Sequence, residues 1–472
     1  MKIVFLMGIF LSGCFFGPVQ ELHDQIEETY FGNDFIELPT PLYDLKSNVD
    51  LEVIWQENIG KHDGRNLDIF QTDEFFYAAT SDGTIKKLNI ENGDTLWEKN
   101  LETIITSGII GDSNNIYFSS SDGFLWCIDS NGELIWKTLL EGEVNSLPLI
   151  YDSKIVVKLN SYKIVQLNTI DGSILWKYQA AIPPLTFKSE GKFTQSDNVI
   201  YLGLPGGKMI AIDGPTGGLV WESNISRAKG TTDIERANDI TSHPIIDGTI
   251  IYGITTNGDI SALERRSGKT IWTRPISSFY GMVSDGFNLF ITHDTGSIYS
   301  INKEDGEIEW RQAALKYRKI QTGMIINDYV VFGDFDGYIH FLKIDGGSIL
   351  GRIKFEDSRI LNNIIKVGNS KLALMTATGD IIYLKVGEQT INDELEFENG
   401  ETSILSNDSQ INKKSNNLKK HRIFDNDEED LLEESVDGEE SVDGEEMKPS
   451  RNKKHRVFDK NKKEKGFLDW LY

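Results

Sequence analysis

The side chains that most often carry catalysis or bind metals are few and scattered in this 472-residue chain. The seven His residues lack the i, i+4 spacing by which two imidazoles on one helix hold zinc, and two Cys residues are too few for a thiolate metal site. Spacing alone assembles no set of Ser, His and Asp for nucleophilic catalysis. The residues alone therefore indicate no metal site, no cofactor site and no catalytic set.

Two short motifs look like ligand-binding loops, but each lacks a required part. Ser267-Gly-Lys-Thr270 has the ending of a phosphate-binding loop, yet Leu263 stands where the first Gly belongs and Ile271-Trp272 continues a strand where a helix should begin. Asp334-Phe-Asp336-Gly337 has the start of a calcium loop without the later Glu. We therefore expect a hairpin turn at the first motif and no calcium site at the second.

Cys14 is the one residue for which the sequence predicts a chemical modification. Residues 1–13 have the parts of an export signal: Lys2, an apolar run from Ile3 to Leu11, and small residues before the cleavage point. The run is shorter than the roughly 20 residues that a membrane-spanning helix needs. Leu11-Ser-Gly-Cys14 resembles the bacterial lipobox, which implies cleavage before Cys14, acylation of its thiol and attachment to a membrane through the acyl chains.

The residue after Cys14 bears on the destination of the protein. Phe15 stands where a lipoprotein of the inner membrane usually carries Asp, so the resemblance implies delivery to the outer membrane. A plain signal peptide that happens to contain a Cys is the alternative. Residues 14–50 contain Gly17, Pro18, Pro39 and Pro41 and no strong periodicity, and we interpret them as a tether.

A repeated unit organises residues 51–388. Its clearest copy, Ser81 to Trp97, contains the turn signals Asp82-Gly83 and Asn92-Gly93 around a run with apolar residues near alternate positions. Six further copies follow, and an eighth stops near Val386. The closing Trp returns at intervals of 38 to 51 residues, at Trp97, Trp136, Trp176, Trp221, Trp272 and Trp310. This period, with turn-rich strands and no helical pattern, is typical of a propeller.

The incomplete last copy predicts how the ring closes. Leu51-Glu-Val-Ile-Trp55 looks like an isolated Trp-bearing outer strand, and by completing the last blade it would leave no unpaired edge. We therefore predict an all-β fold, an eight-bladed β-propeller with four strands in each blade, closed by this N-terminal strand. The recurring Trp side chains should pack between neighbouring blades. In the seventh copy Gly351 takes the Trp position.

Composition changes again at residues 389–472. Asp425 to Glu446 holds 13 acidic residues and no Lys or Arg, and we expect a segment of this kind to be disordered. Two basic and aromatic motifs flank it, Lys419-Lys-His-Arg-Ile-Phe-Asp425 and Lys453-Lys-His-Arg-Val-Phe-Asp459. They could bind a protein or an anionic surface, or they could simply be solvated. The net charge of −25 argues against a nucleic-acid partner. We expect Cys127 to be a small buried apolar residue.

The blade sequences carry a family resemblance. Met209-Ile-Ala-Ile-Asp213 with Gly217 and Trp221 resembles the repeat of pyrroloquinoline-quinone (PQQ) propellers. Ile225 to Pro244 and Asn257 to Trp272 are similar, nearly residue for residue, to the same region of the BamB family, lipoproteins of the outer-membrane β-barrel assembly machinery. This implies a lipid-anchored, non-enzymatic scaffold on the periplasmic side of the outer membrane. Such a scaffold docks on BamA and helps to present unfolded outer-membrane proteins for insertion.

The resemblance also implies a docking surface made of two loops. The family's Leu-x-Leu-Arg segment matches Leu185-Thr-Phe187-Lys188, and its Asp-x-Asp segment matches Asp239-Ile-Thr241. Leu185 and Asp239 are kept, Phe187 changes the shape of an apolar anchor, and Lys188 lacks the planar fork of Arg. Thr241 has lost the second carboxylate. The two longest intervals between successive Trp residues run from Trp176 to Trp221 and from Trp221 to Trp272. The extra loop length is therefore concentrated in two adjacent blades, which are also the blades that carry the two matched segments.

A PQQ- and calcium-dependent quinoprotein dehydrogenase on the same fold is the alternative function. A resemblance to that dehydrogenase family would imply a calcium-bound quinone over the centre of the ring and two Cys residues next to each other in the sequence. This chain has no Cys-Cys pair. The sequence leaves open which client proteins are handled and what residues 389–472 do.

Overall fold

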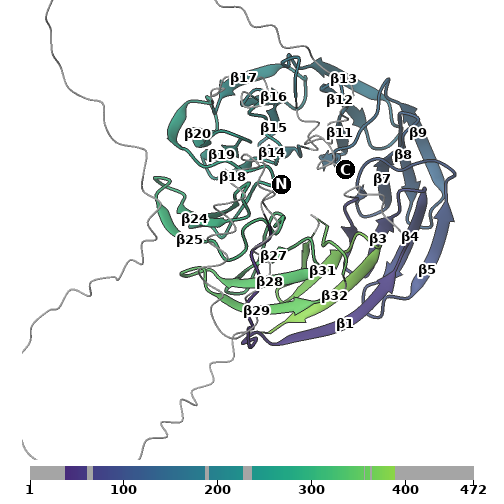
Figure 1. Ribbon diagram of the computed structural model, residues 1–472. Coiled ribbons are helices and arrows are strands. Elements are labelled where there is room, and N and C mark those ends of the chain that lie inside the picture. Colours follow the sequence, from purple (N-terminus) through teal and green to yellow (C-terminus); the bar gives the residue numbers. More distant parts are fainter. Residues whose placement is uncertain are drawn as a thin grey trace, which may run out of the picture. The chain divides into compact units, whose positions relative to one another are not determined.

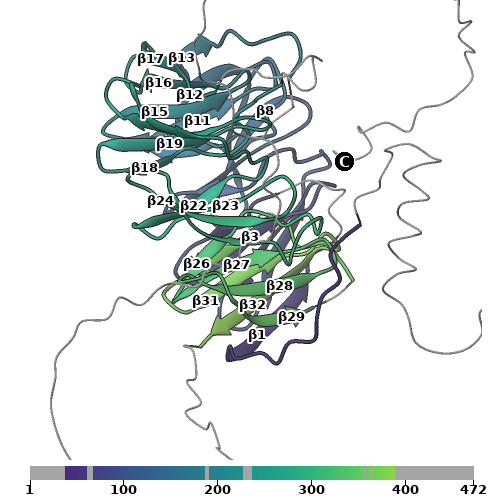
Figure 2. The same cartoon turned by 60° about the vertical axis from the view of Figure 1, so that its left-hand side comes forward.

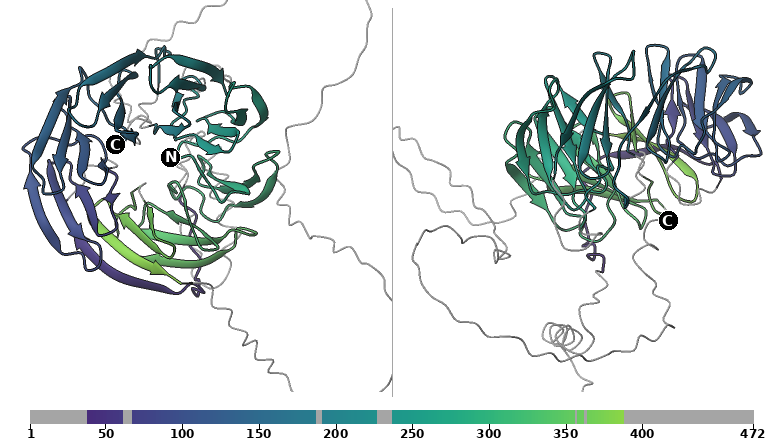
Figure 3. Two further views of the ribbon diagram at one scale, coloured as in Figure 1. Left: turned by 180° about the vertical axis from the view of Figure 1, so that it is seen from behind. Right: turned by 90° about the horizontal axis from the view of Figure 1, so that it is seen from above.

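The computed structural model describes residues 38–60, 67–186, 191–226, 237–355, 357–361 and 364–387. In these residues 32 strands form eight antiparallel four-stranded sheets, which stand around a ring as blades (Figure 1; Figure 3, left). The prediction of an all-β, eight-bladed propeller is confirmed. None of the described segments contains a helix long and apolar enough to cross a bilayer. Cys14, the signal segment and residues 389–472 lie outside the described residues.

Each of the first seven blades is built from four consecutive strands, from the centre of the ring outward. Blade 1 consists of β2 (Phe70–Gln71), β3 (Phe75–Ala79), β4 (Thr84–Asn89) and β5 (Thr95–Asn100), and blade 2 of β6 (Ile110–Gly111), β7 (Asn115–Ser119), β8 (Phe124–Asp129) and β9 (Leu134–Leu139). Blade 3 consists of β10 (Leu149–Tyr151), β11 (Lys154–Lys158), β12 (Lys163–Asn168) and β13 (Ile174–Gln179), and blade 4 of β14 (Thr194–Ser196), β15 (Val199–Leu204), β16 (Lys208–Asp213) and β17 (Leu219–Asn224).

The remaining blades continue this order, except that the first strand of the chain is the outer strand of blade 8. Blade 5 consists of β18 (Ile245–Asp247), β19 (Ile250–Ile254), β20 (Ile260–Glu264) and β21 (Thr270–Arg274), and blade 6 of β22 (Met282–Ser284), β23 (Asn288–Thr292), β24 (Ile298–Asn302) and β25 (Ile308–Gln312). Blade 7 consists of β26 (Met324–Ile326), β27 (Tyr329–Gly333), β28 (Tyr338–Lys343) and β29 (Ile349–Lys354), and blade 8 of β30 (Ile365–Val367), β31 (Lys371–Met375), β32 (Asp380–Val386) and β1 (Leu51–Asn58).

The antiparallel order gives the ring two different faces. The hairpins that join the first and second strands, and the third and fourth, share one face, which we call the hairpin face. The hairpins between the second and third strands share the opposite face with the blade-to-blade connections, and we call this the linker face. Ser267-Gly-Lys-Thr270 lies at the β20–β21 hairpin, as predicted, with Gly268 at a φ of 69°.

Each outer-strand Trp joins its blade to the next one. The ring of Trp136 in blade 2 covers Gly172 in a hairpin of blade 3, where an added Cβ would come within 2.5 Å of Cε3. The indole Nε1 donates to the carbonyl oxygen of Thr169 in the same hairpin, at 2.9 Å. The same pair of contacts, which we call the Trp contact, is made by Trp55, Trp97, Trp176, Trp221, Trp272 and Trp310. The prediction that these rings pack between neighbouring blades is confirmed.

The N-terminal strand closes the ring. β1 pairs with β32 in antiparallel register, with Leu51 opposite Val386, and the two strands lie side by side in Figures 1 and 2. Beyond the sheet, the amide of Gly387 donates to the carbonyl oxygen of Asp50 at 2.8 Å. The predicted closure by Leu51-Glu-Val-Ile-Trp55 is therefore confirmed.

Residues 38–49, which we call the N-terminal strap, lie against blade 7. The amide of Asn48 donates to Leu350 in β29 at 2.8 Å, and an added Cβ on Gly351 would come within 2.7 Å of Val49 Cγ2. Blade 8 has the start of β1 and the end of β32 where the other blades have the hairpin between strands three and four. A Trp at position 351 of blade 7 would have no such hairpin in blade 8 to pack against. Gly351 stands there instead, and Val49 occupies the space that a larger side chain would fill.

Candidate functional site

Of the residues predicted to dock a partner, Leu185 is exposed. It lies in the connection from β13 to β14, between blades 3 and 4, and half of its side chain faces solvent. Ile182 in the same connection is 38 % exposed. The linker face therefore presents two aliphatic side chains three residues apart. Phe187 and Lys188 lie outside the described residues.

Asp239 has a different environment, because its side chain is only 1 % exposed. Its Oδ1 accepts a hydrogen bond from the amide of Gly206 in the β15–β16 hairpin, at 3.0 Å. Its carbonyl oxygen accepts from the amide of Thr256 in blade 5, at 2.9 Å. Asp239 thus connects the β17–β18 connection to the hairpins of two neighbouring blades. Thr241 also binds within the ring, since its hydroxyl donates to the carbonyl oxygen of Phe279 at 2.5 Å.

The hairpin at Gly206 and Gly207 brings the two predicted loops together. Gly206 binds Asp239 on one side, and an added Cβ on Gly206 would lie 3.6 Å from Pro183 Cγ on the other. Both glycines have a positive φ, 77° and 70°, which favours Gly in this turn. The segments that carry Leu185 and Asp239 therefore flank one rigid turn on the linker face. We call Ile182, Leu185, Gly206 and Asp239 the contact site.

Sequence reasoning missed two residues of this region. Gly206 links the two predicted loops through Asp239 and Pro183. Asn238 is 1 % exposed, and neither its Oδ1 nor its Nδ2 has a hydrogen-bond partner in the part of the chain that the structure describes. Its Nδ2 would lie 2.7 Å from an added Cβ on Gly207. Neither feature has a signal in the sequence, because each depends on residues more than thirty positions apart.

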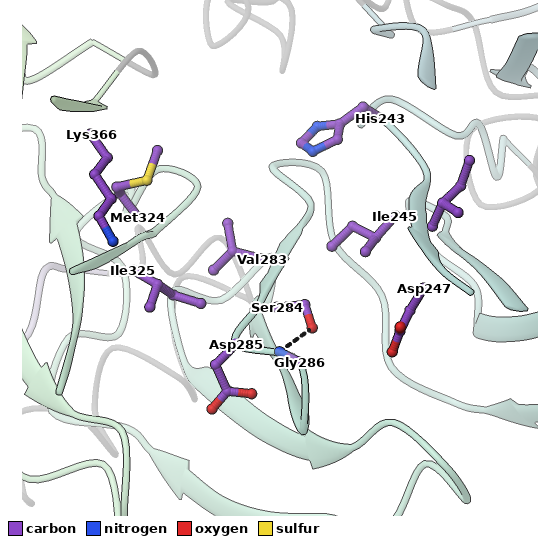
Figure 4. Close-up of a pocket in the computed structure, with 11 residues that line it drawn as sticks. His243, Ile245, Asp247, Val283, Ser284, Asp285, Gly286, Met324, Ile325 and Lys366 are labelled. Atoms are coloured by element: carbon purple, nitrogen blue, oxygen red, sulfur yellow. Dashed lines mark hydrogen bonds between the residues drawn. The ribbon is translucent and has the colours of Figure 1, made fainter. Parts of the chain in front are cut away.

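A cavity of about 600 Å³ is lined by the innermost strands of blades 5, 6 and 7 and by Lys366 of β30 (Figure 4). The aliphatic and Met side chains on its wall are Ile245, Ile246, Val283, Met324 and Ile325. Asp247 in the lining forms an ion pair with Lys303, and Asp285 accepts the amides of Phe287 and Asn288. Burial, and next the positive charge of Lys192, lower the pKa of His243 to about 4.

The residues of this cavity do not fit a calcium-bound quinone. Such a cofactor presents several carboxylates, and Lys366 is the single Lys or Arg among the lining residues, opposite two Asp side chains. The lining includes no Trp, Tyr or Phe ring on which a flat cofactor could stack. Among the described residues, no three His, Cys, Asp or Glu side chains are grouped closely enough to hold a metal ion. The chemistry of the lining therefore gives the dehydrogenase alternative no support.

Asp334 and Asp336, from the calcium-like motif, belong to a charged network in blade 7. Arg318 donates to Asp334 and to Asp336, each at 2.8 Å. Asp334 also contacts Nε2 of His340 at 3.0 Å, and Arg352 donates to Nδ1 of the same ring at 3.2 Å. Burial works to raise the pKa of Asp334, but the bond to His340 and the Arg318 charge hold it below its usual value.

The same two arginines also hold the N-terminal strap. Arg318 Nη1 donates to the carbonyl oxygen of Thr40 at 3.4 Å, and Arg352 Nη1 donates to that of Tyr43 at 2.9 Å. Arg352 also stacks over the Tyr43 ring, 5.3 Å from its centroid. The network is therefore a structural feature of the strap and of blade 7.

The fold and the contact site define the class of this protein: a β-propeller of PQQ-like repeats with an exposed apolar site on its linker face. A family model described as outer membrane protein assembly factor BamB matches residues 81–312. Proteins of that description in Shewanella oneidensis and Nitrosomonas eutropha are 30 % and 31 % identical to this chain over 300 and 287 residues. These matches cover 62 % and 61 % of this chain and 76 % and 70 % of the relatives. The chain belongs to the BamB family.

Other comparisons extend the match and bear on the fold. A BamB protein of Burkholderia pseudomallei is 26 % identical over 345 residues, which cover 73 % of this chain and 90 % of that protein. The crystal structure of BamB from Moraxella catarrhalis has a TM-score of 0.65 at 23 % identity, covering 71 % of this chain and all of that one. A quinohemoprotein alcohol dehydrogenase from Comamonas testosteroni has a TM-score of 0.60 at 12 % identity, covering 73 % and 78 % of the two chains. At these identities the two structures show the shared fold alone.

Proposed function

We propose that this chain is a non-enzymatic scaffold lipoprotein of the outer-membrane β-barrel assembly complex. It docks on the periplasmic domains of a BamA-like protein and assists the folding and insertion of unfolded outer-membrane proteins. Family membership supports the assignment, because the relatives are described as outer membrane protein assembly factors. The observation that carries it is the contact site, where the segments that hold Leu185 and Asp239 flank one hairpin.

The contact site has the composition of a small interaction centre. Leu185 and Ile182 supply exposed aliphatic anchors, and Phe187 and Lys188 add an apolar ring and a charge beside them in the sequence. Anchors of this kind, surrounded by polar groups, dominate the binding energy of many interfaces. In this chain Asp239 contributes by fixing the Gly206 hairpin, so that the anchors are presented on a rigid turn.

The membrane attachment is part of the same proposal. The acyl chains on Cys14 hold the protein at the periplasmic face of the outer membrane, and residues 15–37 connect them to the strap. Clients are unfolded outer-membrane proteins, and no nucleic acid takes part. Replacing Cys14 with Ser should release the protein from the membrane without unfolding the propeller.

Co-purification with the barrel-assembly complex tests the docking site. We expect Leu185→Ala combined with Asp239→Ala to stay folded and membrane-bound but to lose the complex. Leu175→Ala is the matched control, because Leu175 is 48 % exposed on the outer strand of the adjacent blade, away from the linker face. Equal recovery of the complex by the double variant and the control would refute the docking site.

Asp239→Asn separates the two ways in which Asp239 could act. An Asn side chain can still accept the Gly206 amide, whereas Ala leaves that donor without its partner. If Asp239 works by fixing the hairpin, Asp239→Asn should keep most of the binding and Asp239→Ala should lose it. Equal losses of binding in the two variants would show that the partner recognises the negative charge of Asp239 itself.

A further inference from the structure

An ion pair joins two blades that are not neighbours. Lys192 lies two residues before β14 of blade 4, and Asp68 lies two residues before β2 of blade 1. Lys192 Nζ is 2.6 Å from Asp68 Oδ1. Because β14 and β2 are the innermost strands of blades three positions apart, this pair crosses the centre of the ring at the linker face. We call it the cross-ring pair.

The surroundings hold Asp68 in place to receive Lys192. Leu67 and Ile69 on either side are 1 % and 5 % exposed, so the backbone at Asp68 is fixed by burial. The amide of Ile109 in blade 2 donates to the carbonyl oxygen of Asp68 at 3.1 Å. An added Cβ on Gly108 would come within 2.7 Å of Asp68 Cβ, so only Gly allows the two segments to approach this closely.

His243 is a titratable group close to the cross-ring pair. Burial and the Lys192 charge lower its pKa, so the imidazole is neutral around pH 7. Asp68 therefore carries the compensating charge for Lys192. The side chains of Lys192 and Asp68 are 34 % and 15 % exposed, so the pair is less screened than an ion pair on the outer surface.

Lys192 lies near the end of the β13–β14 connection, which carries the exposed side chains of Ile182 and Leu185. This connection leaves blade 3 at Ala180, which is buried and whose amide donates to Tyr162 at 3.2 Å. It enters blade 4 at Phe193, which is 8 % exposed, directly after Lys192. Leu185 lies between these two ends. One end is therefore fixed to its own blade, and the other is fixed across the ring to blade 1.

We infer that Lys192 is a positioning residue for docking: its bond to Asp68 fixes the blade 4 end of the connection that carries Leu185. This inference rests on the proposed function. A loop held before binding loses less conformational freedom on association, which strengthens binding without any new contact. Neither Lys192 nor Asp68 has to touch the partner.

Amide hydrogen exchange of the full-length chain tests the positioning without any partner. We expect Lys192→Met and Asp68→Asn each to speed exchange at the amides of residues 180–182, 185 and 186 by roughly five- to tenfold, with little change in the outer strands. Lys154→Met is the control, because Lys154 forms a local ion pair with Asp152 on the hairpin face. The charge swap Lys192→Asp with Asp68→Lys should restore slow exchange. Unchanged exchange in both single variants would overturn the inference.

A double-mutant cycle with the purified BamA-like partner tests the consequence for binding. Lys192→Met should weaken binding roughly five- to tenfold in the wild-type background and much less when Leu185 is already Ala, because the two act through one contact. Equal losses in both backgrounds would contradict a positioning role. If Leu185→Ala alone had no effect, the proposed docking site would fail, and the exchange result would still decide whether the pair holds the connection.

Discussion

At the scale of single residues, His340 shows how a polar group is kept in the interior of blade 7. The side chain is fully buried, and its two ring nitrogens contact Asp334 and Arg352. Since Arg352 donates to Nδ1, the proton of the neutral ring is on Nε2 and points to Asp334. A second proton would have to go to Nδ1, against the Arg352 donor. Burial lowers the pKa of His340, although Asp334 acts in the opposite direction.

This arrangement predicts a pH dependence of stability. The lowered pKa means that the unfolded chain binds a proton at His340 more readily than the folded chain does. The contribution of neutral His340 is therefore complete above its unfolded pKa of about 6.5 and is lost as the pH falls below it. We expect the free energy of unfolding to fall between pH 7 and pH 5, by at most about 1.4 kcal/mol per pH unit for this group.

Chemical unfolding of His340→Gln across the same range provides the check. The variant should be less stable at pH 7.5, and its profile should be flatter than that of the wild type. Residual slope from other His side chains with a lowered pKa, such as the partly buried His243, would remain. A profile parallel to that of the wild type would mean that His340 does not titrate as the buried network requires.

At the scale of elements, the Trp contact explains why one residue type marks the repeat. Each indole buries its ring against a Gly of the next blade and also donates a hydrogen bond to that hairpin. The Gly and the Trp of a contact come from consecutive copies, so the spacing in the sequence shows both. The sequence does not show why Gly351 replaces Trp, because the reason is the strap residue Val49, about three hundred positions earlier.

The Trp contact makes a graded prediction for Trp136. Trp136→Phe keeps most of the buried ring and removes the donor to Thr169, so it should lower the free energy of unfolding by about 1–2 kcal/mol. Trp136→Ala empties the space over Gly172 and should cost about 3–5 kcal/mol. Urea unfolding measures both. Equal effects would show that the hydrogen bond, and not the ring, sustains the contact.

The elements also show which parts of the site could be predicted from the sequence. Turn signals and period 2 patterns predict the blades and the hairpin at Gly268, because each is set by residues close in sequence. The incomplete last copy of the repeat predicts the N-terminal closing strand. The burial of Asp239 and the bond from Lys192 to Asp68 depend on blades that meet only in the closed ring. For Cys127 the prediction of a buried apolar residue is confirmed, and burial raises its thiol pKa to about 12.

At the scale of the whole molecule, closure gives the ring one face with tight hairpins and one with long connections. The two longest connections begin at β13 and β17, and both reach the Gly206 hairpin on the linker face. The cross-ring pair ties the first of them to blade 1, three blades away. A closed ring thus supplies a rigid base for a binding surface made of otherwise irregular segments.

Site-specific photo-crosslinking in cells tests the central claim most directly, because it reports which face of the ring touches the assembly complex. A photoreactive residue at position 185 should form a covalent adduct with the BamA-like protein, and one at position 175 in the same assay should not. The adduct at 185 should be weaker when Lys192 is Met. An adduct at 175 without one at 185 would contradict the account, because the complex would then be bound through the outer strands and not through the linker face.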